Sequence, residues 1–315
     1  SWLLKFFRAH RLKHQDQNQL FYTLKARSHL DQPLSLPSTE YTPVNYGGMV
    51  YGKSALVFNY LRHYLGSAEY DEMMKSYYTD WQFKHPGPDD FMAYVGKSLA
   101  YRDYWMEQLV YTTHKSDFKV ARLKNSKSGS HLRIKNRGRI RGPVQLTLLS
   151  KNDSTLHQTW LDPFGKDTTI HIAQKNFHLA VLDHNRYSLD INRKNNRIRR
   201  KGILKKVESL RFQWLTGIEE PERTTIYYTP LVGYNTTDQL MAGLLLHNHN
   251  IFQKRIELKA APMYGFGSER TNWMGSARYN FRFESSRWIE NLWFELNTAS
   301  FSTGGIRNRG NFKKG

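Results

Sequence analysis

The 315-residue chain contains no cysteine. This absence excludes a disulfide-stabilised scaffold and every metal site built on thiolates, although it fits any cellular compartment. Long apolar runs are also missing, since the longest aliphatic stretches, such as residues 244–246, are only a few residues long. A membrane-spanning helix needs about 20 apolar residues, so the sequence predicts none. Transmembrane β-strands are recognised by alternation instead, and that class of protein stays open.

Acidic residues are scarce relative to basic ones. The chain has 47 Lys and Arg against 27 Asp and Glu, which gives a formal charge of +20. Residues 111–220 carry most of this excess, with 23 basic and 9 acidic side chains, whereas residues 1–110 hold 12 and 11. A charge imbalance confined to one third of the chain indicates separate domains. The length is sufficient for two or three of them, at roughly 150 residues each.

The first third of the chain has the pattern of a helical region. Apolar side chains recur with helical spacing over 55–65, and Gly66 is a typical helix stop. The same pattern predicts a second helix over Glu69–Trp81. After a Pro-Gly-Pro turn, Asp89 or Asp90 can cap a third helix, whose final turns are expected to extend to Tyr104 and Trp105.

From Phe118 onward the period of the pattern changes to two. Short alternating segments, separated by Gly, Asn, Asp and Ser, predict five or six strands in about 80 residues, which is typical of a small β-sandwich. The segments are Phe118–Leu123, His131–Lys135, Val144–Leu148, Thr168–Ile172 and Phe177–Leu182.

The last third of the chain alternates over longer segments. Arg255–Phe266 and Asn272–Phe283 each have one apolar and one polar face, and their length slightly exceeds the roughly 9–11 residues of a tilted membrane strand. Strands of soluble sheets usually end after about five or six residues, so an outer-membrane-type barrel is favoured over a soluble sheet. Neighbouring strands are predicted over Thr224–Tyr234, Gln239–His247 and Arg287–Phe301. Such barrels need at least about eight strands, so the barrel is expected to be incomplete here.

Together these patterns predict an α+β multi-domain protein. We expect a helical domain over 1–113, a small antiparallel β-sandwich over 114–192, a basic linker over 193–220, and long antiparallel barrel-like strands over 221–315. The chain begins with Ser1 rather than Met, which leads us to expect an internal fragment of a longer protein.

Histidine pairs are the candidate metal ligands in a chain without cysteine. His10 and His14 would share a helical face, but Arg11 occupies the position of the catalytic glutamate in the zinc signature H-E-x-x-H. A solvated basic face is the favoured interpretation there, and loop histidines at a strand end explain His247 and His249. Phosphate-binding loops and nucleophile elbows are also missing. The sequence therefore assigns no metal ligand.

A basic run extends from Arg193 to Lys201 and continues with Lys205 and Lys206. Composition alone permits binding to nucleic acid or to anionic lipid headgroups. The run contains no aromatic residue on which bases could stack, which disfavours nucleic acid. A basic linker next to a membrane, or a solvated loop, is the preferred interpretation.

Residues 41–66 read YTPVNYGGMVYGKSALVFNYLRHYLG. They resemble the segment that follows the zinc site in the gluzincin aminopeptidases, the alanyl-aminopeptidase and leukotriene-hydrolase type. That family has Tyr-x-Lys-Gly at the start of a helix, and the matching residues here are Tyr51, Lys53 and Ser54, with serine in place of the usual glycine. Residues 182–196 are similar to the closing strand and N-x-x-N-N tail of the family's β-domain. The resemblance covers roughly residues 1–200.

The resemblance implies a zinc-dependent peptidase with a peptide substrate. In the family, the tyrosine that matches Tyr51 donates a hydrogen bond to the oxyanion formed when zinc-bound water attacks the peptide, a role that suits a neutral phenol. Tyr46 would then line the same cleft and contact substrate. A packed aromatic residue at a helix start is the alternative for Tyr51. The family's metal helix and third ligand lie N-terminal to this tyrosine, and neither is found in this chain.

We therefore expect a fragment of a membrane-anchored zinc aminopeptidase-like protein. The fragment is expected to be inactive by itself, because the zinc site of the full-length protein is not in this chain. The expected location is a bacterial outer membrane, with the peptidase part in the periplasm. The alternative is a non-catalytic peptidase-like binding or assembly module of a bacterial outer-membrane protein. A soluble nucleic-acid binder is the third class, and the sequence disfavours it.

Overall fold

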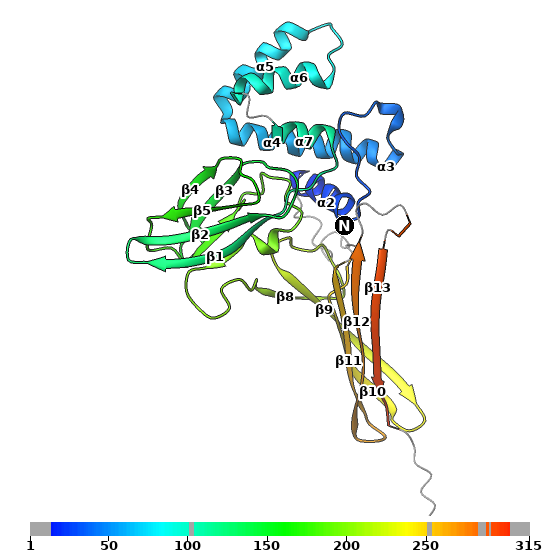
Figure 1. Ribbon diagram of the computed structural model, residues 1–315. Coiled ribbons are helices and arrows are strands. Elements are labelled where there is room, and N and C mark those ends of the chain that lie inside the picture. Colours follow the sequence, from blue (N-terminus) through cyan, green and yellow to red (C-terminus); the bar gives the residue numbers. More distant parts are fainter. Residues whose placement is uncertain (1–13, 101–103, 251–253, 283–287, 290, 303–315) are drawn as a thin grey trace, which may run out of the picture. The chain divides into compact units, whose positions relative to one another are not determined.

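The computed structural model describes residues 14–100, 104–250, 254–282, 288–289 and 291–302 (Figure 1). The chain divides into two compact units, one formed by Arg11–Glu208 and the other containing Ser209–Gly315. We call them the N-terminal and the C-terminal unit.

The N-terminal unit begins with helices. They are α2 (His14–Arg27), η2 (Ser38–Glu40), α3 (Pro43–Asn45), η3 (Tyr46–Lys53), α4 (Ser54–Leu65), α5 (Ser67–Trp81), α6 (Pro88–Ser98) and α7 (Tyr104–Tyr111). Gly66, with a φ of 88°, ends α4 and precedes α5, so the predicted helix stop is confirmed. No helix in the described part of the chain is long and apolar enough to cross a membrane.

The third predicted helix differs from the structure at both ends. Gly87 is the N-cap of α6, and the Asp90 carboxylate accepts a hydrogen bond from the Gly87 backbone N–H at 2.7 Å. The helix ends at Ser98, because Ala100 adopts a left-handed φ of 49° that α-helical backbone does not allow. Tyr104 and Trp105 belong to the separate helix α7, so the expected extension of one helix to these residues is wrong.

One hydrophobic core joins the helices to the β-strands of the same unit. Tyr60 of α4 and Trp105 of α7 are completely buried, with ring centroids 4.7 Å apart. The Tyr60 hydroxyl donates a hydrogen bond to the carbonyl of Pro143, just before a strand. Ile140 and Leu189, from the β-part, lie in the same core. The helices are therefore fixed to the β-part by packing and not only by chain connection.

Two antiparallel sheets form the β-part of the N-terminal unit. One has the order β1-β2-β5, from β1 (Phe118–Ser126), β2 (Gly129–Asn136) and β5 (Asp167–Ile172). The other has the order β4-β3-β6-β7, from β3 (Val144–Leu149), β4 (Thr155–Leu161), β6 (Leu179–Leu182) and β7 (Arg197–Arg199). Buried side chains from both sheets, such as Ile134 and Leu146, share one core. Strand β4 is not among the predicted strands, because its residues are largely exposed and do not alternate.

The segment expected to begin a basic linker is folded at its start. Arg193 is only 4% exposed, forms an ion pair with the buried carboxylate of Asp183, and donates to the carbonyl of Ser188 at 2.6 Å. Asn196 is buried as well, and residues 197–199 form strand β7. An arginine in a basic run is normally predicted to be solvent-exposed. Arg193 is buried instead, because the carboxylate of Asp183, ten residues earlier in the chain, neutralises its charge.

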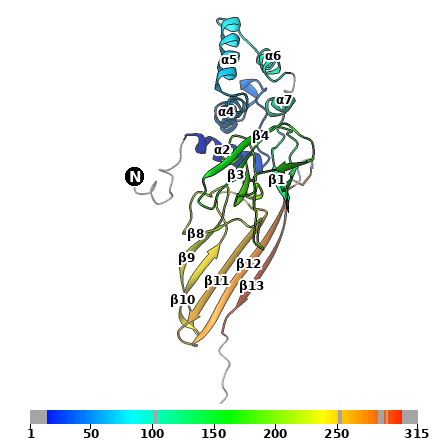
Figure 2. The ribbon, with the colours of Figure 1, turned by 90° about the vertical axis from the view of Figure 1, so that its left-hand side faces the viewer.

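A six-stranded sheet forms the described part of the C-terminal unit, in the order β13-β12-β11-β10-β9-β8 (Figure 2). The strands are β8 (Leu210–Trp214), β9 (Thr224–Asn235), β10 (Gln239–His247), β11 (Ile256–Gly265), β12 (Arg270–Arg282) and β13 (Asn291–Ser300). Strands β9 to β13 follow one another as an antiparallel meander, whereas β8 pairs with β9 in parallel. The α+β class with antiparallel sheets is thus confirmed. The described strands form an open sheet, and no closed barrel is found among them.

Candidate functional site

A π-helical segment holds the two tyrosines that the sequence singles out. Residues Tyr46–Lys53 form a π-helix, η3, between α3 and α4. In an α-helix, residues five apart point about 140° away from each other, since each residue turns the helix by about 100°. A π-helix pairs residues i and i+5, and such segments often occur at functional sites. The π register therefore brings Tyr46 and Tyr51 onto one side of the helix.

Tyr46 and Tyr51 present their rings together at the surface. Their ring centroids are 6.0 Å apart in an edge-to-face arrangement, and the side chains are 40% and 65% exposed. Hydrogen bonding with Tyr51 raises the pKa of Tyr46 above its ordinary value. Tyr46 is thus a neutral phenol near pH 7 and can donate a hydrogen bond. These exposures also argue against the alternative that Tyr51 is a packed core residue.

The inner side of η3 is packed closely against α2. Gly48 is buried, and a Cβ atom at this position would lie 1.8 Å from Cε1 of Phe21 in α2. Met49, Gly52 and Lys53 face the same way and are also buried. Glycine at position 48 therefore allows the close approach that fixes the π-helix in place.

A buried charge cluster includes Lys53, the last residue of η3, and was not found by sequence reasoning. Lys115 is ion-paired with Asp31 at 2.6 Å, and both side chains are less than one tenth exposed. Lys53 is completely buried and donates a long hydrogen bond, 3.4 Å, to the carbonyl of Thr112. Burial lowers the pKa of Lys53 to about 8, against the attraction of Asp31. The only sequence signal for this cluster is the lysine of the Tyr-x-Lys motif.

The described residues do not fit a zinc ion. They contain no group of three or more His, Cys, Asp or Glu side chains that could hold a metal. The His10–His14 pair lies outside the described side chains. His247 and His249 have ring centroids 6.0 Å apart, and the Nδ1 atom of His249 lies 3.8 Å from a carboxylate oxygen of Glu257. This pair supplies two imidazoles and one distant carboxylate, which is not a zinc geometry.

The six-stranded sheet of the C-terminal unit has two chemically distinct faces. Residues that pair directly across antiparallel strands point to the same face. One face, the apolar face, carries Leu244, Leu258, Ala277 and Leu296 on successive strands, and no strand residue on it is charged. The other, the polar face, carries Glu257, Lys259, Arg278 and Glu295 among others.

Exposure of these two faces is the reverse of that in a water-soluble sheet. No residue of the apolar face is buried, and Val232 and Leu296 are each 70% exposed. The buried residues of the strands lie on the polar face and include Tyr227, Glu257 and Asn272. A soluble antiparallel sheet buries its apolar face against a core. In transmembrane barrels, by contrast, strands alternate apolar-out and polar-in.

Aromatic side chains of the apolar face gather toward the strand ends. Tyr234, Tyr264 and Trp273 lie next to the turns that connect β9 to β10 and β11 to β12. Tyr279 and Phe281 of β12, with the neighbouring Phe294 of β13, lie near the opposite ends. Between these groups the face of β9 to β13 consists mainly of Leu, Ala, Val and Pro, with Tyr228 as an exception, and next to Tyr228 the short strand β8 adds Phe212 and Trp214.

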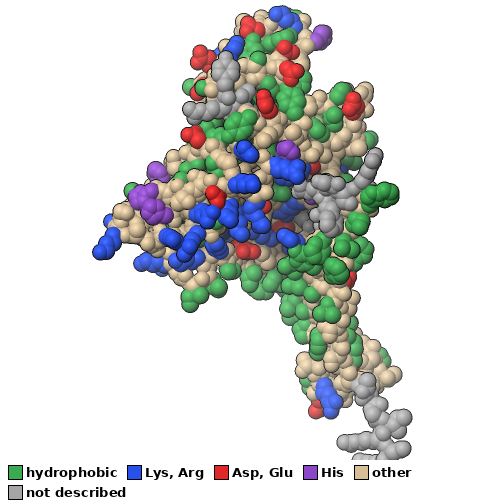
Figure 3. Space-filling model, in the orientation of Figure 1, with side chains coloured by type: hydrophobic (Ala, Val, Ile, Leu, Met, Phe, Trp, Pro, Cys, Tyr) green, Lys and Arg blue, Asp and Glu red, His purple; other side chains and the backbone are tan. Residues whose placement is uncertain are grey.

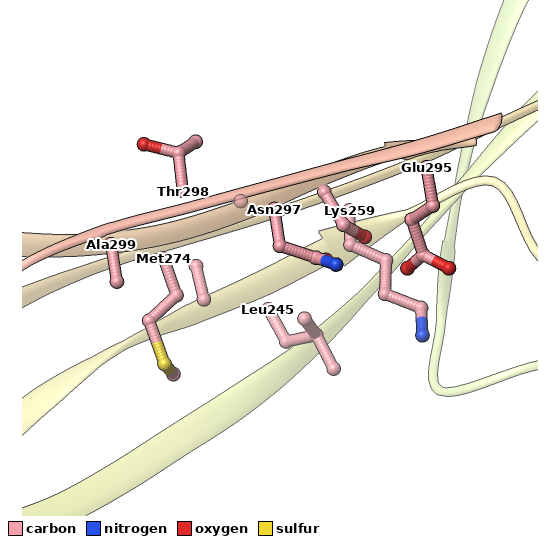
Figure 4. A pocket seen from close by; sticks show the side chains of 10 residues that line it. Leu245, Lys259, Met274, Glu295, Asn297, Thr298 and Ala299 are labelled. Atoms are coloured by element: carbon pink, nitrogen blue, oxygen red, sulfur yellow. The ribbon is translucent and has the colours of Figure 1, made fainter.

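An open groove on the polar face occupies about 460 Å³. The side chains of Leu245, Lys259, Asn297 and Glu295 lie on this side of the strands, whereas Thr298 points to the other (Figure 4). Glu295 accepts hydrogen bonds from the guanidinium of Arg278, the Nε bond being 2.9 Å. The groove therefore offers charged and amide groups next to a few apolar ones.

We expect Gly48→Ala to destabilise the N-terminal unit by about 1–3 kcal/mol, because the new methyl group overlaps Phe21. Gly47→Ala is the matched control, since a Cβ there meets nothing within 4 Å. Urea unfolding of both variants measures the difference. Equal stabilities of the two variants would contradict the proposed packing of η3 on α2.

The Lys53→Met variant tests the buried lysine through the pH dependence of the free energy of unfolding. Above about pH 8 the folded chain releases the Lys53 proton, whereas the unfolded chain keeps it up to about 10.5. Between these values the unfolded state binds more protons, so Lys53 makes the wild type more stable as pH rises. We expect the stability of wild type relative to Lys53→Met to increase by about 2 kcal/mol from pH 7 to pH 10. Parallel stability curves in urea unfolding would contradict this.

Comparisons with known proteins give little further information. No protein-family model matches the chain, and no curated protein matches it in sequence. Among solved structures, the chain is similar to aminopeptidase A of Legionella pneumophila, solved in complex with aspartic acid, at 14% sequence identity and a TM-score of 0.40. The match covers 49% of this chain and only 18% of that enzyme.

Proposed function

We propose that the C-terminal unit inserts into a lipid bilayer as part of an outer-membrane-type β-barrel and anchors the N-terminal unit there. The observation that carries this proposal is the exposure of the two faces: the apolar face is solvent-exposed and uncharged, and the polar face holds the buried residues. Additional strands from outside the described residues would close the barrel. The location that follows is a bacterial outer membrane, with the N-terminal unit on its periplasmic side.

The strand lengths support a lipid bilayer as the environment of the apolar face. Strands β9 to β13 have between 9 and 13 residues. At about 3.3 Å per residue and a tilt of about 45°, ten residues span roughly 25 Å, the height of the apolar band of a membrane barrel. The aromatic residues near the strand ends then lie where membrane barrels have their aromatic girdles.

Because the chain lacks cysteine, a single introduced cysteine can carry a nitroxide label on either face. Leu244 and Leu245 are adjacent leucines on opposite faces of β10, so Leu244→Cys and Leu245→Cys form a matched pair. In chain reconstituted into lipid vesicles, we expect the label at 244 to collide with dissolved oxygen and be protected from a water-soluble nickel chelate. The label at 245 should show no such lipid signature. Labels at both positions that are equally open to the nickel chelate would overturn the anchoring proposal.

We further propose that the N-terminal unit is the back part of an aminopeptidase-like domain that acts on peptides. Its support is the exposed pair of tyrosines on a π-helix, with Tyr51 as the hydrogen-bond donor to an oxyanion and Tyr46 lining the substrate cleft. Because the described residues do not fit zinc, only the contribution of these tyrosines can be assigned to this chain. The chain alone is therefore expected not to hydrolyse peptides.

The second candidate is a non-catalytic peptidase-like module that binds peptides or assists assembly at the membrane. Its support is the exposed pair of Tyr46 and Tyr51, which can contact a peptide without a metal. Metal content separates the two candidates. The complete natural protein, extracted from membranes in detergent, should contain about one zinc per chain if it is an enzyme and none if it is a binding module.

Tyr51→Phe tests the role of the phenol in that natural protein. Loss of one oxyanion donor typically lowers kcat by about 10²–10³-fold, so we expect this loss on a peptide substrate with little change in KM. Tyr46→Phe should mainly raise KM. Tyr78→Phe is the control, because Tyr78 of α5 is as exposed as Tyr51, at 66%, but lies on another helix. Equal kcat for the Tyr51→Phe and Tyr78→Phe variants would exclude a catalytic role for Tyr51.

A further inference from the structure

The sheet β1-β2-β5 has a strongly basic outer face. Lys119 lies directly opposite Lys135, and Arg122 lies opposite Arg133. Lys124 is opposite His131, which in turn is opposite His171. We call Lys119, Arg122, Lys124, Arg133 and Lys135 the basic face. Like charges directly opposite each other destabilise a sheet, so this arrangement does not serve the stability of the fold.

Little on this face neutralises these charges. Asp167 is the only acidic residue in the three strands, all of which the structure describes, and it is ion-paired with Arg133. The register of β1 shifts between Val120 and Arg122, which leaves Ala121 as an extra residue. This irregularity returns Arg122 to the outer face, where normal alternation would have turned it inward. Figure 3 shows Lys and Arg side chains gathered over this part of the molecule.

A basic loop runs beside the free edge of β1. It comprises residues 201–206, which read KGILKK. The Nζ atom of Lys206 donates to the carbonyl of Ala121, and the side chain of Asn125 donates to the carbonyl of Arg200 at 3.3 Å. The loop and the basic face therefore form one continuous surface.

The tip of this loop is apolar and projects into solvent. Ile203 is 99% exposed and Leu204 is 65% exposed, while lysines flank them on both sides. Apolar side chains framed by Lys are typical of segments that enter the boundary between lipid headgroups and acyl chains. The loop also leads into the six-stranded sheet along the chain, because Leu210, on the apolar face of β8, follows Lys206 by four residues, at most about 14 Å of chain.

We propose that the basic face and the 201–206 loop bind the phosphate-bearing headgroups of anionic lipids, with Ile203 and Leu204 inserted below the headgroups. This inference rests on the proposed anchoring of the C-terminal unit and adds a second, electrostatic contact of the N-terminal unit with the same bilayer. Each lysine near an anionic surface strengthens such binding by about fivefold.

Nucleic acid is the other polyanion that such a face could attract, and two observations disfavour it. The outward-facing residues of β1, β2 and β5 include no Phe, Tyr or Trp on which a base could stack. Exposed aliphatic residues at the loop tip serve no purpose beside a phosphate backbone, whereas a bilayer offers them an apolar medium.

The test measures the insertion of the 201–206 loop and that of the six-stranded sheet separately in the full-length chain. Ile203→Cys carries an environment-sensitive fluorophore, and Leu244→Cys carries the same fluorophore in a parallel sample. Both are reconstituted into nanodiscs of phosphatidylcholine with increasing amounts of phosphatidylglycerol. We expect the label at 244 to report lipid in every mixture. The label at 203 should shift to an apolar environment only with phosphatidylglycerol, and high salt should reverse the shift.

Variants that remove lysines test whether the basic face causes the insertion of the loop. Lys119→Gln, Lys124→Gln and Lys135→Gln together should reduce the ratio of inserted to exposed loop by about 100-fold, as three lysines are removed. Lys75→Gln, Lys84→Gln and Lys97→Gln remove the same charge from exposed positions in α5, in the turn that follows it and in α6, and should leave the ratio unchanged. Thermal unfolding checks that both triple variants remain folded.

Three outcomes would overturn the inference. A label at 203 that stays aqueous in every mixture, while the label at 244 reports lipid, would reject headgroup binding and leave the anchor intact. Equal effects of the two triple variants would show a general charge effect. A change in the fluorescence of the label at 203 on addition of a DNA or RNA oligonucleotide, with no response to phosphatidylglycerol, would assign the surface to nucleic acid. An aqueous label at 244 would instead reject the anchor itself.

Discussion

The apolar face of the six-stranded sheet is the constraint on which the interpretation of this chain depends. Leaving a large side chain such as Leu or Phe in water, instead of burying it, costs about 1.5–3 kcal/mol. Strands β8 to β13 expose many such side chains on one face, among them Phe212, Val232 and Leu296. Contiguous exposed apolar patches beyond a few hundred Å² are rare on soluble monomers. This exposure is why we propose a bilayer as the environment of the face, and strands β9 to β13, with 9 to 13 residues each, are long enough to cross one.

The polar face of the same sheet shows how the strands satisfy their buried polar groups. Asp238, in the turn between β9 and β10, accepts hydrogen bonds from Ser268 of the neighbouring turn and from Asn235, which hold the pKa of its carboxyl well below the usual value. Lys254 lies 3.2 Å from Glu219. Such networks compensate the cost of burying charge. They place polarity on the side that a barrel interior keeps away from lipid.

The parts of the fold that follow a regular period could be predicted from the sequence. The segment Gln239–His247 matches β10, and helix α4 ends at the predicted Gly66. Features that depend on contacts between distant residues could not. Arg193 reads as part of a basic linker because its partner Asp183 belongs to an earlier strand region, and burial of an ion pair leaves no periodic signal.

The sequence singles out the two tyrosines of the candidate site but does not predict their geometry. The resemblance to the gluzincin aminopeptidases points to Tyr51 and Tyr46, yet five residues of separation place them on different sides of any α-helix. Only the π register unites them, and that register depends on glycine at position 48 against Phe21 of another helix. The buried cluster of Lys53, Lys115 and Asp31 is likewise assembled from three separate segments. No local pattern could predict this assembly.

Charge and apolarity are distributed so that the two units pose complementary requirements. The C-terminal unit exposes an uncharged apolar face, and the N-terminal unit carries a basic face for which we propose a polyanion as partner. A bilayer with anionic headgroups meets both requirements with one partner, since its acyl core and its phosphates are only a few ångströms apart. The 201–206 loop combines both features within six residues, because it has exposed aliphatic side chains at its tip and lysines on both sides of them. A soluble polyanion would meet only the second requirement and would leave Ile203 and the sheet face in water.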